Sequence, residues 1–246
     1  MKCVQTLVVF VFAAIFLSVP NSYAAVAFQK DSFTITLPEG WIAIPQDVLA
    51  AMYTEVKKQA PNAKIPRYDY GFQLGSSQNW MEYPYILVQV NKASRIPEHQ
   101  LESLPTIDLN EKLKDQAANM QTLMSSASLG KMQYDKAAHI VWVTMQSDVV
   151  NVGKIQGISG LIPTEIGFVQ VHAYSKTSDF ESYVPMFRQI IVGTAINPSL
   201  VYKPRWTDSS PIFSGIDWGQ VAGKAIAGAV IGGLIALFAG IKRKNK

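Results

Sequence analysis

Three histidines and one serine are the residues whose types suit metal binding or hydrolysis. His99, His139 and His172 are 40 and 33 residues apart, without the short spacing by which a helix presents two metal ligands. His139 and His172 fall on expected strands, and His99 falls in a polar loop beside Glu98. We therefore expect hydrogen-bonded or solvated imidazoles, and we predict no metal ion.

Ser159 lies in the stretch Gly-Ile-Ser-Gly-Leu, which lacks the last glycine of a nucleophile elbow and precedes no expected helix. We interpret it as a strand or bulge residue. The chain also lacks the glycine-rich loops that hold nucleotide phosphates, so no cofactor and no catalytic residue is predicted. One alternative stays open: an exported hydrolase whose site joins distant residues, with Ser159 or a carboxylate beside His139 or His172.

Composition excludes several classes of protein. Of the 246 residues, 48% are hydrophobic and 16% are charged, which is unlike a disordered or coiled-coil chain. A single cysteine excludes a disulfide scaffold and a cysteine-based zinc site. The net charge of +4 equals the charge of the last five residues alone, which contain Lys242, Arg243, Lys244 and Lys246. This placement argues against nucleic-acid binding and indicates membrane orientation.

The first 24 residues resemble a secretory signal. Lys2 precedes an apolar stretch over 7–17, Pro20 breaks the helix, and small residues end the segment, so we place cleavage between Ala24 and Ala25. Retention as an uncleaved anchor is the alternative. In both cases the following domain is exported.

Residues 216–241 are predicted to form a transmembrane helix. From 221 to 241 only Lys224 is charged, and 21 helical residues extend about 32 Å, enough for a hydrocarbon core of roughly 30 Å. The basic tail, residues 242–246, follows at once. The positive-inside rule therefore predicts a cytoplasmic C-terminus and a domain outside a bacterial inner membrane.

Small residues recur every fourth position of this span: Gly228, Gly232, Ala236 and Gly240. They share one helix face and would let a second helix approach closely, so self-association or docking to a partner helix is one interpretation. The other is that glycine and alanine are simply common in membrane helices. No polar stripe favours a pore.

Between these two ends, the sequence predicts an α+β domain over 25–196 with a largely antiparallel sheet. The expected strands are 28–37, 41–44, 69–74, 85–91, 130–134, 139–147, 152–163 and 165–175. The expected helices are 45–60, 105–124 and 179–192. Gly157 and Gly160 suggest a bulge. Residues 197–215, rich in proline and serine, are expected to be a flexible tether.

Two short motifs of this domain resemble the PsbP-like family. Residues 33–41, Phe-Thr-Ile-Thr-Leu-Pro-Glu-Gly-Trp, are similar to the family's opening strand and turn, and residues 174–192 are similar to its closing strand and aromatic helix. The resemblance covers about 28–196. It implies an α/β/α sandwich with an antiparallel sheet, used for binding or assembling partner proteins and not for catalysis. The membrane span departs from the soluble members.

Aromatic residues with polar tips crowd one stretch of the domain: Tyr68, Tyr70, Trp80, Tyr83 and Tyr85. Partner-binding surfaces are enriched in such residues, although strand alternation would turn about half of them into the core. The expected function is a membrane-tethered, noncatalytic binding or assembly module. An accessory subunit of a transport or secretion complex is a further alternative, which differs only in its partner.

Overall fold

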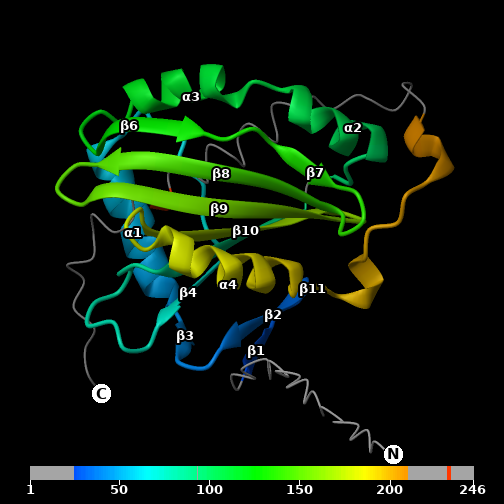
Figure 1. Cartoon of the computed structure of the whole chain (residues 1–246), viewed down its shortest axis with the longest axis horizontal. Helices are drawn as coiled ribbons and strands as arrows, with labels where there is room; N and C mark the ends of the chain where they lie inside the picture. The colour runs from blue at the N-terminus through cyan, green and yellow to red at the C-terminus, as the bar shows by residue number, and fades with distance from the viewer. Residues whose placement is uncertain (1–24, 93, 210–231, 234–246) are drawn as a thin grey trace, which may run out of the picture.

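The computed structural model describes residues 25–92, 94–209 and 232–233. Its centre is an antiparallel sheet of eight strands in the order β3-β4-β5-β10-β9-β8-β6, with β7 also paired to β8 (Figure 1). The strands are β3 (Trp41–Ala43), β4 (Tyr70–Leu74), β5 (Tyr85–Asn91), β6 (Met124–Leu129), β7 (Gln133–Asp135), β8 (Ile140–Val149), β9 (Gly153–Thr164) and β10 (Gly167–Lys176).

Both faces of this sheet are covered. Helices α1 (Gln46–Gln59), α2 (Glu98–Ser103) and α3 (Leu109–Ala118), with the turn η1 (Leu104–Thr106), contribute to the core on one face, which we call the α1 face. Helix α4 (Phe180–Val192) and a small antiparallel sheet cover the other, the α4 face. The small sheet joins β1 (Ala25–Gln29), β2 (Phe33–Pro38) and β11 (Ala195–Ile196). The predicted α+β class, with antiparallel strands between helices, is confirmed.

Hydrophobic spacing explains the elements that were predicted well. Phe33, Ile35 and Leu37 alternate along β2 and are at most 1% exposed, because alternate side chains of a strand point to one face. On α1, Val48, Leu49, Met52 and Val56 follow helical spacing and are buried. In each case local periodicity and tertiary burial select the same residues.

The middle of the chain differs from the prediction. The long helix expected over 105–124 is α2, η1 and the shorter α3, and Met124 already begins β6. The predicted helix was too long because Met120 and Met124 continue the helical spacing of buried residues. In the structure residues 120–124 form a turn closed by a hydrogen bond from the Leu123 amide to the Met120 carbonyl. Pairing of β6 with β8 then outweighs helix propensity.

Three further predictions were wrong. His139 lies in the turn before β8, with a φ of 50°, and not on a strand. His99 lies within α2 and not in a loop. The bulge expected at Gly157 and Gly160 does not form, since β9 pairs without a register break on both sides there. These glycines instead allow close packing: a Cβ at 157 would lie 2.8 Å from Tyr174, and one at 160 would overlap Ile191 of α4.

Part of the segment expected to be a flexible tether lies against the domain. Turns η2 (Pro198–Leu200) and η3 (Trp206–Ser209) follow β11, and Val201 forms a β-bridge with Thr164. Proline and serine content did not reveal these contacts, because they depend on partners far away in the sequence. The rest of the tether, the signal (1–24) and the basic tail lie outside the described residues.

Within the ranges the structure describes, no helix has the length and apolar character needed to cross a membrane. The predicted span at 216–241 lies outside those ranges except for Gly232 and Gly233, which are helical and buried.

Candidate functional site: a cluster of buried tyrosines

Four tyrosines converge on the α1 face and form what we call the tyrosine site: Tyr68, Tyr83, Tyr85 and Tyr174. Tyr85 on β5 and Tyr174 on β10 are directly paired across the sheet, and their ring centroids are 5.3 Å apart. Tyr83 stands two residues before Tyr85 and stacks on it at 4.9 Å. Tyr68 joins from the segment between α1 and β4, where its hydroxyl is hydrogen-bonded to that of Tyr174.

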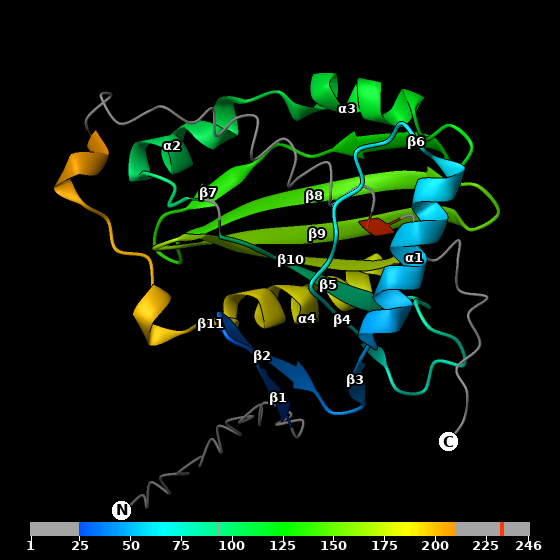
Figure 2. The same cartoon turned by 180° about the vertical axis from the view of Figure 1, so that it is seen from behind.

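The tyrosine site holds Gly232 and Gly233, which are about 150 positions from Tyr83 and Tyr85 in the chain. The Tyr85 hydroxyl donates a hydrogen bond to the Gly232 carbonyl at 2.7 Å, and the Tyr83 hydroxyl donates one to the Gly233 carbonyl at 2.5 Å. Tyr68 also hydrogen-bonds the backbone of Gly232. Figure 2 shows this short segment in red beside α1, over the strands of the large sheet. The site therefore recognises backbone groups.

The close approach at the tyrosine site requires glycine at position 232. A Cβ built there would overlap the Tyr174 hydroxyl and lie 2.7 Å from both Tyr174 Cζ and the Tyr68 oxygen. At Gly233 a Cβ would lie 2.9 Å from Met145 Cε. Gly232 is thus held by fully packed rings, whereas Gly233 faces the end of a flexible side chain.

Burial sets the charge state of the tyrosine site. It raises the pKa of Tyr68, Tyr83, Tyr85 and Tyr174 above the ordinary value of 10.0, because a phenolate in a desolvated site is unfavourable. All four hydroxyls are neutral at neutral pH and stay so to a higher pH than an exposed tyrosine would, and those of Tyr83 and Tyr85 donate to backbone carbonyls. Neutral hydroxyl groups that donate to backbone carbonyls suit recognition of a peptide segment better than recognition of an ion.

A serine–histidine pair adjoins the tyrosine site. Ser159 on β9 and His172 on β10 are paired across the sheet, and the Ser159 Oγ lies 2.7 Å from His172 Nδ1. The His172 ring lies 5.9 Å from that of Tyr68. Both residues are at most 1% exposed, and burial lowers the pKa of His172 to about 3, so its imidazole is neutral. The pair combines the two residues that the hydrolase alternative requires.

Several buried polar atoms on this face lack a hydrogen-bond partner among the described residues. They include His172 Nε2, Gln170 Oε1, Gln89 Oε1 and Ser147 Oγ. Gln89 and Gln170 are paired across β5 and β10, next to the pair that includes His172. Ser147 Oγ lies 3.6 Å from a Cβ built at Gly233. Because buried polar atoms are normally hydrogen-bonded, these four atoms are ones that a polar group on this face would satisfy.

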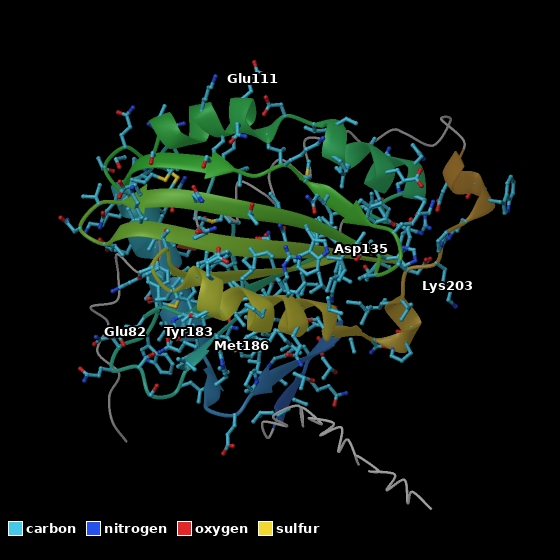
Figure 3. All side chains as sticks on the ribbon, in the orientation of Figure 1. Glu82, Glu111, Asp135, Tyr183, Met186 and Lys203 are labelled. Atoms are coloured by element: carbon cyan, nitrogen blue, oxygen red, sulfur yellow. The ribbon has the colours of Figure 1, made fainter. Side chains whose placement is uncertain are left out.

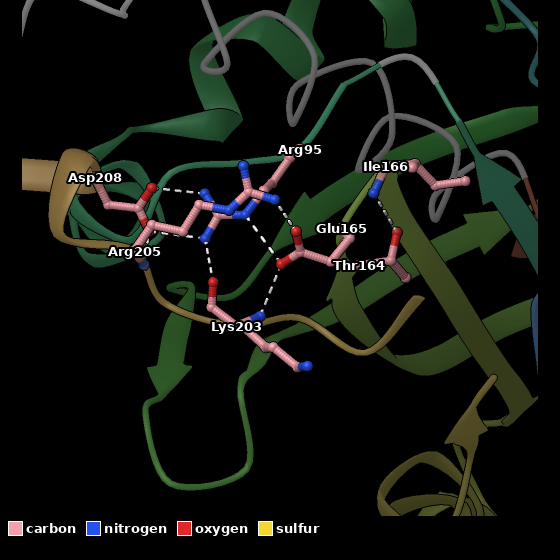
Figure 4. Close-up of polar contacts among 7 residues, drawn as sticks. All are labelled: Arg95, Thr164, Glu165, Ile166, Lys203, Arg205 and Asp208. Carbon is pink, nitrogen blue, oxygen red and sulfur yellow. Dashed lines mark hydrogen bonds and ion pairs between the residues drawn. The ribbon is translucent and has the colours of Figure 1, made fainter. Parts of the chain in front are cut away.

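A second polar cluster fixes the segment that leads away from the domain. Arg95 forms a two-point ion pair with Asp208, at 2.6 and 2.8 Å, and donates to the Lys203 carbonyl at 2.6 Å (Figure 4). Glu165 forms ion pairs with both Arg95, at 3.3 Å, and Arg205. Burial would raise the pKa of Asp208, but hydrogen bonds from Arg95 and the Arg205 amide lower it overall. These ion pairs and hydrogen bonds hold η3 against the domain.

The structure brings together only part of the predicted aromatic surface. Tyr70 packs edge-on against Phe33 at 5.5 Å on the α4 face, and Trp80 packs beside the α1-face core. Tyr174 was missed because pairing of β5 with β10 is not visible in one sequence. Of the predicted helix-packing residues, Gly232 lies in the tyrosine site, whereas Gly228, Ala236 and Gly240 lie outside the described residues.

Other site types find less support. The described residues contain no group of three or more metal-binding side chains. A surface pocket of about 570 Å³ lies between α1 and β4 and is lined by Tyr53, Arg67, Tyr68 and Asp69, among others. The Arg67 guanidinium stacks on the Tyr53 ring there at 4.7 Å. Tyr68 thus lines this pocket and also belongs to the tyrosine site.

Comparison with known proteins gives structural likeness alone. No protein-family model matches the chain, and no curated protein matches it. Cyanobacterial PsbP from Synechocystis has a TM-score of 0.46 and 10% identity, over 73% of this chain and 96% of that one. LpqN of Mycobacterium tuberculosis, which is involved in cell envelope biogenesis, has a TM-score of 0.35 and 12% identity, over 72% and 93%. The class that the structure itself defines is an α+β domain with a buried tyrosine site.

Proposed function

We propose that this protein is a membrane-tethered, noncatalytic binding module of the PsbP-like type, acting at the outer face of a bacterial cytoplasmic membrane. The observation that carries the proposal is the tyrosine site, where neutral hydroxyls of Tyr83 and Tyr85 hold the carbonyls of Gly232 and Gly233. Buried tyrosines that donate to backbone carbonyls and exclude a Cβ constitute a binding site for a helix with small residues. The signal, the apolar span and the basic tail supply the membrane location.

The tether can be tested by alkaline carbonate extraction of membranes from cells that produce the full chain. We expect the protein to remain in the membrane pellet, because an apolar helix of about 21 residues resists release. A control chain that ends after residue 215 should be released. Release of the full chain would contradict the membrane part of the proposal.

The binding role can be tested by cross-linking in cells followed by mass spectrometry. Tyr85→Phe removes one buried donor and keeps the ring, and Tyr70→Phe is a matched control from the same stretch on the opposite face of the sheet. We expect a defined partner protein that Tyr85→Phe weakens and Tyr70→Phe does not. An identical set of partners for the wild type and both variants would contradict a binding role of the tyrosine site.

A hydrolase is the second candidate, because Ser159 and His172 are within hydrogen-bond distance. Three features weigh against it. Both side chains are buried, the His172 pKa of about 3 makes a weak general base, and Nε2 has no carboxylate partner in the described ranges. A screen with activated esters tests this candidate, and activity abolished by Ser159→Ala would favour it over the binding role.

A further inference from the structure

The predicted membrane span and the tyrosine site compete for the same residues. Gly232 is the twelfth residue of the apolar run 221–241, so in a membrane helix it would lie about 17 Å from the start, near the middle of the bilayer. In the structure its carbonyl instead accepts a hydrogen bond from Tyr85, within a domain predicted to lie outside the membrane. One residue cannot occupy both positions at once.

We infer that the tyrosine site is an intramolecular receptor for the C-terminal segment around Gly232 and Gly233, and that this segment exchanges between the site and the bilayer. The inference rests on the proposed function, because it requires both the span and the site. The bound state shelters an apolar segment against the domain, and the inserted state opens the site.

The chemistry of the site suits such an exchange. Docking of Gly232 and Gly233 uses hydrogen bonds from neutral tyrosine hydroxyls and close packing on glycine. In the bilayer a helix satisfies its own backbone groups, so the segment loses no essential hydrogen bond when it leaves. The hydroxyls left behind need new acceptors, which water or a partner's carbonyl groups can supply.

The occupant is this chain's own segment because the fit depends on its sequence. Gly232 enters where any side chain would overlap Tyr174, and Gly233 follows beside Met145. The arrangement explains why Tyr83, Tyr85 and Tyr68 all direct polar groups to two successive residues. A second copy of the chain would present the same residues, so the experiment must separate the two cases.

Photo-cross-linking of the full chain tests the inference. A benzophenone amino acid replaces Tyr83, which is only half-buried at the edge of the site, and a control chain carries it at Tyr183 on α4, across the sheet (Figure 3). Trypsin then releases a peptide of residues 68–92 and one of 225–242, which contains Gly233. When the chain is synthesised without lipid, the probe at position 83 should link these two peptides within one chain. The probe at position 183 should give no such link.

Lipid and one substitution should each weaken the link. Liposomes of phosphatidylethanolamine and phosphatidylglycerol present during synthesis should reduce it about tenfold, as the segment inserts. Gly232→Leu should reduce it about tenfold even without lipid, because the side chain overlaps Tyr174, whereas Gly233→Ala, whose Cβ meets only the end of the flexible Met145 side chain, should reduce it far less.

Three results would overturn the inference: no link without lipid, a link between two copies of the chain, or a link that neither lipid nor Gly232→Leu reduces. Failure of the proposed function can be distinguished from failure of this inference. If carbonate releases the full chain, the membrane role fails whatever the cross-link shows. If the chain resists carbonate and retains its partner but gives no link, only the inference fails.

Discussion

At the scale of residues, burial decides what the polar groups of this protein can do. His172 and Ser159 are paired within the sheet, where an imidazole is held neutral by desolvation. For the same reason the tyrosine hydroxyls stay protonated to a higher pH than exposed tyrosines do. One physical cause, loss of water, therefore weakens a histidine as a base and fixes tyrosines as donors.

The pH dependence of stability follows from His172. Its pKa of about 3 in the folded chain lies below the ordinary 6.5, so above pH 6.5 it is neutral in both states and its contribution is complete. Between pH 6.5 and pH 3 only the unfolded chain binds a proton at His172. The free energy of unfolding therefore decreases as the pH is lowered, by up to about 1.4 kcal/mol per pH unit. Urea unfolding of the wild type and His172→Gln should show this slope in the wild type alone.

NMR of labelled histidine gives an independent check. The His172 resonances should not titrate between pH 8 and pH 5, whether or not the variant folds well. A midpoint near 6.5 for this residue would contradict a buried, desolvated imidazole.

Gly157 should be intolerant of any side chain. Gly157→Ala would place a Cβ 2.8 Å from Tyr174 Cδ1 and 3.0 Å from the Ala173 carbonyl, and we expect a loss of about 1–3 kcal/mol in the free energy of unfolding. Ser126→Ala, at an exposed position of β6, should change it by less than about 0.5 kcal/mol. Equal denaturation midpoints for the two variants would show that β9 and its neighbours shift enough to accommodate a Cβ at position 157.

At the scale of elements, an ion pair between Arg95 and Asp208 holds η3 against the domain. The side chains of Arg95 and Asp208 are 11% and 6% exposed, which makes their ion pair one of the more buried contacts of η3. By contrast, the Lys136–Glu102 pair has side chains 68% and 47% exposed, so solvent screens it strongly.

Substitution of the two pairs should have different consequences. Asp208→Asn should lower the free energy of unfolding by about 2 kcal/mol and speed tryptic cleavage after Arg205, because Arg95 loses one of its two carboxylate partners. Lys136→Gln should have no measurable effect on either quantity. Because the pKa of Asp208 is lowered, the contribution of its pair is present above its ordinary pKa of 3.8 and is lost as the pH falls below that value. Unchanged cleavage in Asp208→Asn would show that η3 is held by other contacts.

Periodic elements could be predicted from the sequence, and pairings could not. Strand β2 and helices α1 and α4 have local spacing that coincides with their burial, so their patterns sufficed. Strand β6 reads Met-Ser-Ser-Ala-Ser-Leu, a weak alternation that only pairing with β8 makes a strand. The tyrosine site was found in part, through Tyr68, Tyr83 and Tyr85, but Tyr174 and Gly232 required the register of β10 and a contact between distant segments.

At the scale of the whole molecule, the account joins two observations of different origin. The sequence predicts membrane attachment through residues 216–241, and the structure places Gly232 and Gly233 of that segment on the α+β domain. A binding module whose site accepts its own anchor would remain closed until the anchor inserts. Membrane insertion and availability of the site are then one event.

The contact between Tyr85 and Gly232 is the most direct test of this account. Nuclear Overhauser effects between the ring protons of Tyr85 or Tyr174 and the α-protons of Gly232 should be observed in the full chain, labelled at tyrosine and glycine and kept free of lipid. Tyr85→Phe, which removes the donor to the Gly232 carbonyl, should weaken the contact between the Tyr174 ring and Gly232, and Tyr70→Phe on the opposite face should preserve it. The account is contradicted if the wild-type chain, with its domain folded, shows no such contact.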